Sequence, residues 1–133
     1  MRTLLASALL LVVGCASGQW GSAVDGIRLQ ARVNPADPGT IVLTLDNGSS
    51  QSIGYNLCSS QIARLDGTTW TNVEENRACT MELRMLEPGG TDQYTVPLPP
   101  GARPGEYRYT TSINRNNTDD TLRVSSNSFR IGG

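Results

Sequence analysis

The sequence predicts an all-β domain, either a sandwich or a barrel, that follows an export signal. The chain has 133 residues, which is enough for one domain with a single core. About seven to nine short segments alternate apolar and polar residues, and turn residues separate them about every ten positions. Outside the N-terminal segment, no long run has the 3.6-residue period of a helix.

Each predicted strand rests on such an alternation or on a short apolar run. The predicted strands are Ile27–Val33, Ile41–Leu45, Ile53–Leu57, Ile62–Leu65, Trp70–Val73, Cys79–Leu86, Tyr94–Leu98, Glu106–Ile113 and Leu122–Ile131. Within Cys79–Leu86, we expect Met81, Leu83 and Met85 to share one face of a strand. Clusters such as Asn34–Gly39 separate the strands, because Pro fixes φ and Gly accepts positive φ in turns.

The N-terminal residues indicate export. Arg2 supplies one positive charge, Leu4–Val13 is almost entirely apolar, and small residues follow. This order is typical of a secretory signal peptide, and the apolar run is shorter than the roughly 20 residues of a membrane-spanning helix. A buried apolar segment of a cytosolic protein is the alternative interpretation.

The end of this segment resembles the lipobox of bacterial lipoproteins. The matching residues are Val12, Val13, Gly14 and Cys15. The resemblance implies cleavage before Cys15, a diacylglyceryl group on its thiol and a fatty acid such as palmitate on the new amino terminus. Several acyl chains anchor a protein stably in a membrane. An ordinary signal peptide with a free Cys15 is the alternative.

The signal sets the expected organisation and location. We expect a signal peptide at 1–14, the lipidated cysteine with a short tether at 15–24, and one domain at 25–133. Ala16 follows the cysteine, where an Asp would retain many lipoproteins in the inner membrane, so the outer membrane is the expected destination. The expected partner of Cys15 is therefore the membrane itself.

The cysteine count supports this interpretation. Three cysteines are an odd number, and lipid on Cys15 leaves Cys58 and Cys79 as a pair. An oxidising envelope favours a structural disulfide, which would stabilise the fold by about 3 kcal/mol. A redox pair and a metal site are the alternatives, but redox pairs usually have closer spacing, and two thiolates without His bind zinc poorly.

Five short motifs, in order, resemble those of a bacterial immunoglobulin-like domain of secreted and lipid-anchored proteins. They are Leu43–Asn47, Leu65–Val73, Leu86–Gly89, Pro104–Arg108 and Ser126–Ile131. The resemblance covers about residues 27–131 and implies an immunoglobulin-like β-sandwich of about 7–9 antiparallel strands. It implies no catalytic residue, and the Cys58–Cys79 pair is not general to the family.

The motif residues have expected structural roles. They include Trp70, Pro88, Gly89, Pro104, Gly105, Tyr107, Arg108 and Phe129. The Pro-Gly pairs suit turns, and Tyr107 suits a tyrosine corner, in which its hydroxyl holds a backbone carbonyl. Trp70 and Phe129 are expected in the core rather than in a ligand site.

Composition excludes several functions. The sequence has no His, which removes most catalytic triads, most zinc sites and the commonest general base. The net charge of −1 argues against nucleic-acid binding. The acid pairs Glu74–Glu75 and Asp119–Asp120 suit solvated positions, because neighbours on a strand point to opposite faces. We therefore expect no enzyme activity, no cofactor and no metal.

Two roles remain for an anchored domain of this kind. The first is a binding or scaffolding module that holds a protein or glycan partner at one end or one strand edge. The alternative is a proteinase inhibitor, with Pro97–Gly105 and Asn114–Thr121 as the contact loops. Both roles rest on fold analogy.

Overall fold

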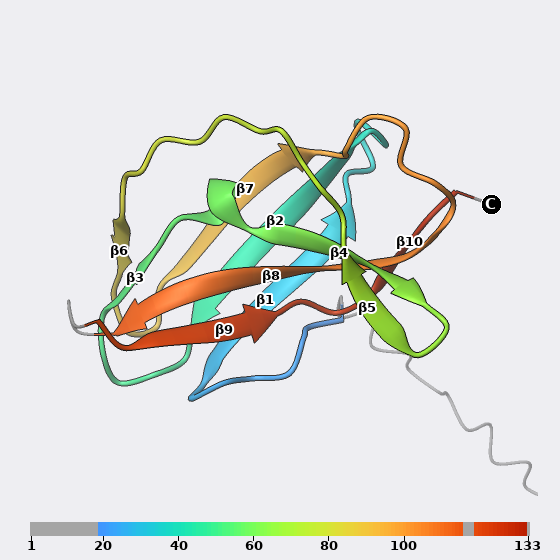
Figure 1. Cartoon of the computed structure of the whole chain (residues 1–133). Helices are drawn as coiled ribbons and strands as arrows, with labels where there is room; N and C mark the ends of the chain where they lie inside the picture. Colours follow the sequence, from blue (N-terminus) through green and yellow to red (C-terminus); the bar gives the residue numbers. More distant parts are fainter. Residues whose placement is uncertain (1–18, 116–118, 133) are drawn as a thin grey trace, which may run out of the picture.

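Two antiparallel sheets pack face to face in this computed structural model, which describes residues 19–115 and 119–132 (Figure 1). The strands are β1 (Ile27–Val33), β2 (Thr40–Asn47), β3 (Ile53–Tyr55), β4 (Gln61–Asp66), β5 (Thr69–Asn72), β6 (Arg84–Leu86), β7 (Thr91–Pro97), β8 (Gly105–Arg115), β9 (Thr121–Ser125) and β10 (Phe129–Ile131), and a short 3-10 turn, η1, spans Leu57–Ser59. The lipobox residues Val12, Val13, Gly14 and Cys15 lie outside the described residues.

The long strand β8 organises the larger sheet. The smaller sheet has the order β1-β2-β7, and the larger has the path β5-β4-β8-β3-β6. Strands β4 and β3 pair with successive parts of β8 along one edge, while β10 and β9 pair with it along the other. The fold is therefore the predicted all-β sandwich.

Most of the predicted strands are confirmed. The described residues form ten strands, because the predicted strand Leu122–Ile131 is interrupted at Ser126–Ser128 and becomes β9 and β10. The predicted strand Ile53–Leu57 is shorter, since Leu57 already belongs to η1. The extra strand changes nothing in the predicted fold class.

The prediction of one strand over Cys79–Leu86 is wrong. Only Arg84–Leu86 pairs with β3, and Met81, Leu83 and Met85 are 98%, 47% and 45% exposed. The physical reason is a set of tertiary contacts. A disulfide at Cys79 and a hydrogen bond to the Thr80 carbonyl fix residues 79 and 80 beside η1, so the chain joins the β3 ladder only from Arg84.

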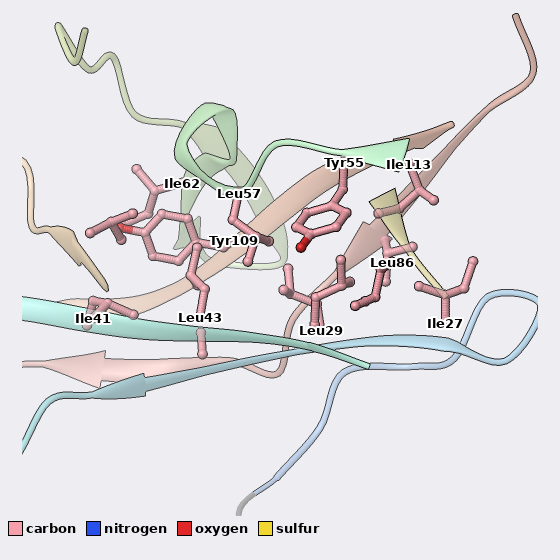
Figure 2. Packing of buried hydrophobic residues seen from close by; sticks show 14 of the residues in the cluster. Ile27, Leu29, Ile41, Leu43, Tyr55, Leu57, Ile62, Leu86, Tyr109 and Ile113 are labelled. Carbon is pink, nitrogen blue, oxygen red and sulfur yellow. The ribbon is translucent and has the colours of Figure 1, made fainter. Parts of the chain in front are cut away.

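Alternating residues from both sheets fill the space between them (Figure 2). Leu29 and Leu43 contribute from the smaller sheet, and Tyr109 and Ile113 contribute from β8. Burying each large side chain stabilises the fold by about 1.5–3 kcal/mol. Phe129 packs against this core and lies 5.9 Å from the Tyr109 ring, as expected from the sequence.

The expected tyrosine corner is present. The Tyr107 hydroxyl donates a hydrogen bond of 2.6 Å to the Arg103 carbonyl, just before the Pro104–Gly105 pair that leads into β8. In the other Pro-Gly turn, Gly89 has φ 78°. That turn is tied to β2 by a hydrogen bond from the Gly89 amide to the Asn47 carbonyl.

The expectation that Trp70 belongs to the core is wrong. Its side chain is half-buried on the outer face of the larger sheet, where the Arg108 guanidinium lies 4.4 Å from the ring centroid. Trp70 pairs with Leu65, which is also half-buried and not part of the core cluster. A cation–π contact on the surface replaces the expected burial.

One side of the sandwich, where β1 meets β9 and β10, is closed by the side chain of Asn127. Its Oδ1 accepts from the Ala31 amide and its Nδ2 donates to the Ala31 carbonyl, each at 2.9 Å. A parallel bridge between Leu29 and Ser126 continues the contact. We call this the closed side.

The opposite side, bordered by β6 and β7, is the open side. The chain from Val73 to Leu83 crosses it between β5 and β6 (Figure 1). No helix within the described residues is long and apolar enough to span a membrane.

Candidate functional site

The crossing segment, residues 73–83, is the candidate functional segment. Within the described chain it belongs to no helix or strand, yet three contacts hold it beyond the backbone hydrogen bond from the Val73 amide to the Ile62 carbonyl. The predicted disulfide between Cys58 and Cys79 is present, with a Cα–Cα distance of 5.8 Å. Asn56, which caps η1, donates to the Thr80 carbonyl at 2.6 Å. The third contact comes from Arg77.

Arg77 ties the segment to η1 and the start of β4. Its guanidinium donates to the Cys58 carbonyl at 3.0 and 2.6 Å and to the Ser60 carbonyl at 2.9 Å. It also donates to Glu75 at 2.8 Å. Since these carbonyls lie beyond any strand ladder, Arg77 supplies the donors that regular structure would otherwise provide.

Glu75 and Arg77 form a largely buried ion pair. Their side chains are only 13% and 16% exposed. Burial raises the pKa of the Glu75 carboxyl, and the Arg77 charge offsets part of that rise. The pair therefore places one carboxylate in a partly dry setting at the centre of the segment.

Two hollows meet at this ion pair. The first, of about 460 Å³, is lined by the disulfide, Ser60 and the β5 end of the segment. The second, of about 620 Å³, lies between residues 73–77 and the loop that follows β7. Both hollows include Glu75 and Arg77 in their walls.

The walls combine apolar and charged groups. In the second hollow, Leu98 and Pro99 provide apolar groups, and the lining also includes Glu74, Arg103 and Arg64, which is paired with Asp66 at 3.0 Å. In the first hollow, the Ser60 hydroxyl is buried and has no hydrogen-bond partner within the described residues. Such a mixture suits recognition of a partner more than bond chemistry.

The charges of the Glu75–Arg77 pair also affect the pKa of the buried Tyr109 hydroxyl. Burial is the largest cause of its raised pKa, the Glu75 charge adds to the rise, and the Arg77 charge opposes it. Tyr109 is fully buried. It therefore stays protonated at physiological pH and contributes no nucleophile.

A third hollow, of about 250 Å³, lies on the open side between the segment and β7. The Tyr55 hydroxyl donates to Asp92 at 2.5 Å, and Arg84 is 3.8 Å from the same carboxylate. Burial and the hydrogen bond to Asp92 raise the pKa of Tyr55 to about 12. Glu82 and Arg84 line the mouth of this hollow.

The described residues hold no cluster of three His, Cys, Asp or Glu side chains placed to bind a metal. Of the two acid pairs, Glu75 binds Arg77 while Glu74 is exposed, and Asp120 binds Arg115 at 2.6 Å.

The two loops expected to contact a protease lie in different settings. Most of Pro97–Gly105 forms a wall of the second hollow. The loop Asn114–Thr121 includes residues 116–118, which lie outside the described residues. Sequence reasoning missed Arg77 and Asn127, because a single Arg or a single Asn in a polar stretch carries no local signal of a partner far along the chain.

The geometry defines an immunoglobulin-like β-sandwich. The chain belongs to the family described as bacterial Ig-like domain, whose pattern matches residues 26–126. No curated protein matches the sequence significantly.

Two solved structures share the fold. The structural-genomics target SoR45 is 15% identical, with a TM-score of 0.58 over 84% of this chain and 90% of that chain. A protein from Bordetella pertussis, assigned as ApaA, is 19% identical, with a TM-score of 0.53 over 86% of this chain and 94% of that chain. At these identities the likeness concerns the fold alone.

Proposed function

We propose that this chain is a lipid-anchored, non-catalytic binding module of the bacterial cell envelope. The observation that carries the proposal is the meeting of two hollows at the Glu75–Arg77 pair, on a segment that is fixed without belonging to a strand. A fixed recognition segment loses little conformational freedom when a partner binds. Family membership and the absence of His support a role without catalysis.

The walls favour a protein partner over a glycan. The only aromatic residue among the lining residues of the two hollows is Tyr107, which is 1% exposed and offers no ring face for stacking. Apolar surface beside charges of both signs matches an extended protein segment with its own mixed side chains. A glycan remains a distinct outcome of the binding test.

The anchor follows from the lipobox resemblance at Val12–Cys15. The disulfide supports an oxidising compartment such as the envelope. We expect Cys15→Ser to move the protein from the membrane fraction to the soluble envelope fraction, whereas Ser22→Ala should stay with the membrane. An unchanged distribution of the Cys15→Ser protein would remove the anchor from the proposal.

The binding role is tested with a photo-crosslinking residue placed in the full-length protein in its own envelope. Asn76 is exposed in the wall of the second hollow, and exposed Gln93 on β7 lines neither of the two hollows. We expect one protein to be crosslinked from position 76 and not from position 93. The purified partner should then compete for the site and saturate it. Equal crosslinking from both positions would contradict a site at the hollows.

The same experiment separates the alternative roles. A protease trapped at position 76 and inhibited near stoichiometrically would make the protein an inhibitor. A carbohydrate that blocks crosslinking would make the partner a glycan. The inhibitor role has the weaker support, because the Pro97–Gly105 loop forms the wall of a hollow, whereas an inhibitor needs a loop that enters a protease cleft.

A further inference from the structure

We propose that two copies of this chain pair edge to edge through Met81–Met85 on the open side, with a two-fold axis at Leu83. This contact is separate from the hollows at Glu75 and Arg77, so it goes beyond the proposed binding role. The partner is thus a second copy of the same chain.

The first observation is exposed apolar surface at an unpartnered sheet edge. Strand β6 pairs with β3 on one side only, and Met81, Leu83 and Met85 are 98%, 47% and 45% exposed. Within the described chain, the backbone of residues 81–83 joins no ladder and no turn. Exposed sheet edges are templates for another strand, and exposed Met side chains adapt readily to a partner.

The second observation is that the edge is complementary to itself. The sequence Met81-Glu82-Leu83-Arg84-Met85 has the same apolar pattern in both directions and opposite charges on either side of its centre. In an antiparallel pair centred on Leu83, Met81 faces Met85 of the second copy and Glu82 faces Arg84 of the second copy. Every cross-strand pair is then apolar–apolar or oppositely charged, and both kinds are stabilising.

The third observation is that the charges are available for such pairing. Arg84 is 64% exposed, and its nearest carboxylate, Asp92, lies 3.8 Å away and is already bonded to Tyr55. Glu82 is exposed at the mouth of the third hollow. Neither side chain must break a close intramolecular ion pair to reach a second copy.

The chain already holds this edge close to its sheet. Leu83 packs over Gly54 on β3, where a Cβ on Gly54 would lie 2.8 Å from Leu83 Cδ2. The disulfide at Cys79 fixes the start of the segment. A two-fold axis makes the contact the same surface on both copies, which closes the assembly as a dimer.

Charge exchange tests this register. In full-length protein purified in detergent, sedimentation should show a reversible, concentration-dependent dimer. Glu82→Arg and Arg84→Glu should each weaken dimerisation about tenfold, because each places like charges opposite each other twice. Arg123→Glu, on β9, should leave dimerisation unchanged and is the matched control.

Two recombinations make the test specific. An equimolar mixture of Glu82→Arg and Arg84→Glu proteins should dimerise again. One copy then carries two positive charges at positions 82 and 84, and these face two negative charges on the other copy. The double exchange Glu82→Arg with Arg84→Glu should also restore the dimer. General damage to the fold would not be rescued in either way.

Three results would overturn the proposal. The wild-type protein could stay monomeric at every concentration reached, or dimerise with no response to the exchanges. It could also bury Met81 only when envelope membranes or another protein are added, which would assign the edge to a different occupant. Loss of the dimer with intact crosslinking at Asn76 would contradict the dimer and leave the proposed binding role in place. Loss of crosslinking at Asn76 with an intact dimer would contradict the binding role and leave the dimer in place.

Discussion

The closed and open sides of this sandwich solve the problem of a free sheet edge in different ways. On the closed side, Asn127 pairs with both backbone groups of Ala31, and the Gly21 amide donates to the Leu29 carbonyl. On the open side, β6 is three residues long and the chain before it is held by a disulfide and Arg77. Among the described residues, four of the five exposed large apolar side chains lie there: Met81, Leu83, Met85 and Tyr94.

The difference between the two sides indicates which sheet edge can bind a partner. The backbone groups of Ala31 and the Leu29 carbonyl on the closed side are satisfied within the chain, so a partner strand would gain little there. The open side is fixed by side chains and by a covalent bond, which leaves its outer edge and its hollows available. Stability should therefore depend on both sides, while binding should depend on the open side alone.

Removing the disulfide should have the largest effect. We expect Cys58→Ser with Cys79→Ser to lower the free energy of unfolding by about 3 kcal/mol, because the unfolded chain gains freedom in a 21-residue loop. Denaturant unfolding measures this loss. Limited proteolysis should then cut first between residues 73 and 83, and a first cut on the closed side would contradict the role assigned to the disulfide.

Asn127→Ala should weaken the closed side nearly as much. The substitution leaves the amide and carbonyl of buried Ala31 without partners, and we expect a loss of about 2 kcal/mol. Denaturant unfolding of Asn76→Ala, an exposed Asn of the open side, gives the matched control with little change. Equal losses in the free energy of unfolding for Asn127→Ala and Asn76→Ala would contradict the role assigned to Asn127 on the closed side.

Tyr107→Phe should have a smaller effect. It removes only the hydrogen bond to the Arg103 carbonyl and keeps the buried ring, so we expect a loss of about 1 kcal/mol. Thermal unfolding at fixed pH measures it. Since Arg103 also lines the second hollow, crosslinking from Asn76 should weaken in this variant. Unchanged crosslinking would show that the tyrosine corner does not contribute to partner binding at the second hollow.

Glu75 should give a pH-dependent effect of smaller size. Burial raises the pKa of its carboxyl in the folded state above the ordinary value of 4.5. The stability contribution of Glu75 is therefore full below that value and declines as pH rises through the folded pKa. Glu75→Gln keeps an acceptor for Arg77, so the variant should gain stability relative to wild type as pH increases above 4.5.

Denaturant unfolding of both proteins across this pH range measures the difference. Glu74→Gln, at the exposed neighbouring position, is the control because it leaves the Glu75–Arg77 contact in place. A wild-type protein that gains stability over Glu75→Gln with rising pH would show that the Arg77 charge outweighs burial.

Met81→Ser should have the smallest effect on stability. Its side chain is 98% exposed, so we expect a change of less than about 0.5 kcal/mol in the free energy of unfolding. Self-association should nevertheless weaken. A large loss of stability in the monomer would mean that Met81 packs within its own chain.

Much of the fold follows from local patterns. Alternation at Ile27–Val33 and the run Ile41–Leu45 predict β1 and β2, and Tyr107 after a Pro-Gly pair predicts the corner. The pairing of Cys58 with Cys79 follows from counting cysteines, with Cys15 assigned to the expected lipid anchor. These features depend on neighbours in sequence or on a very small number of candidates.

Other features depend on distant contacts. Met81, Leu83 and Met85 alternate like a buried strand face, and only the bonds from Cys58 and Asn56 show why the strand does not begin at Cys79. Asn127 meets Ala31 across 96 positions, so no local pattern could reveal it. Trp70 is large and apolar, but Arg108 beside it makes a surface position favourable.

Hydrogen exchange at two protein concentrations tests the contrast between the two sides most directly. The Ala31 amide, bonded to Asn127, should be protected to the same extent at both concentrations. Amides of residues 81–83, which join no strand ladder in the single chain, should exchange quickly in dilute protein and slowly in concentrated protein, as the open edge pairs with a second copy. Equal exchange of residues 81–83 at both concentrations, in protein that is folded at Ala31, would contradict the account.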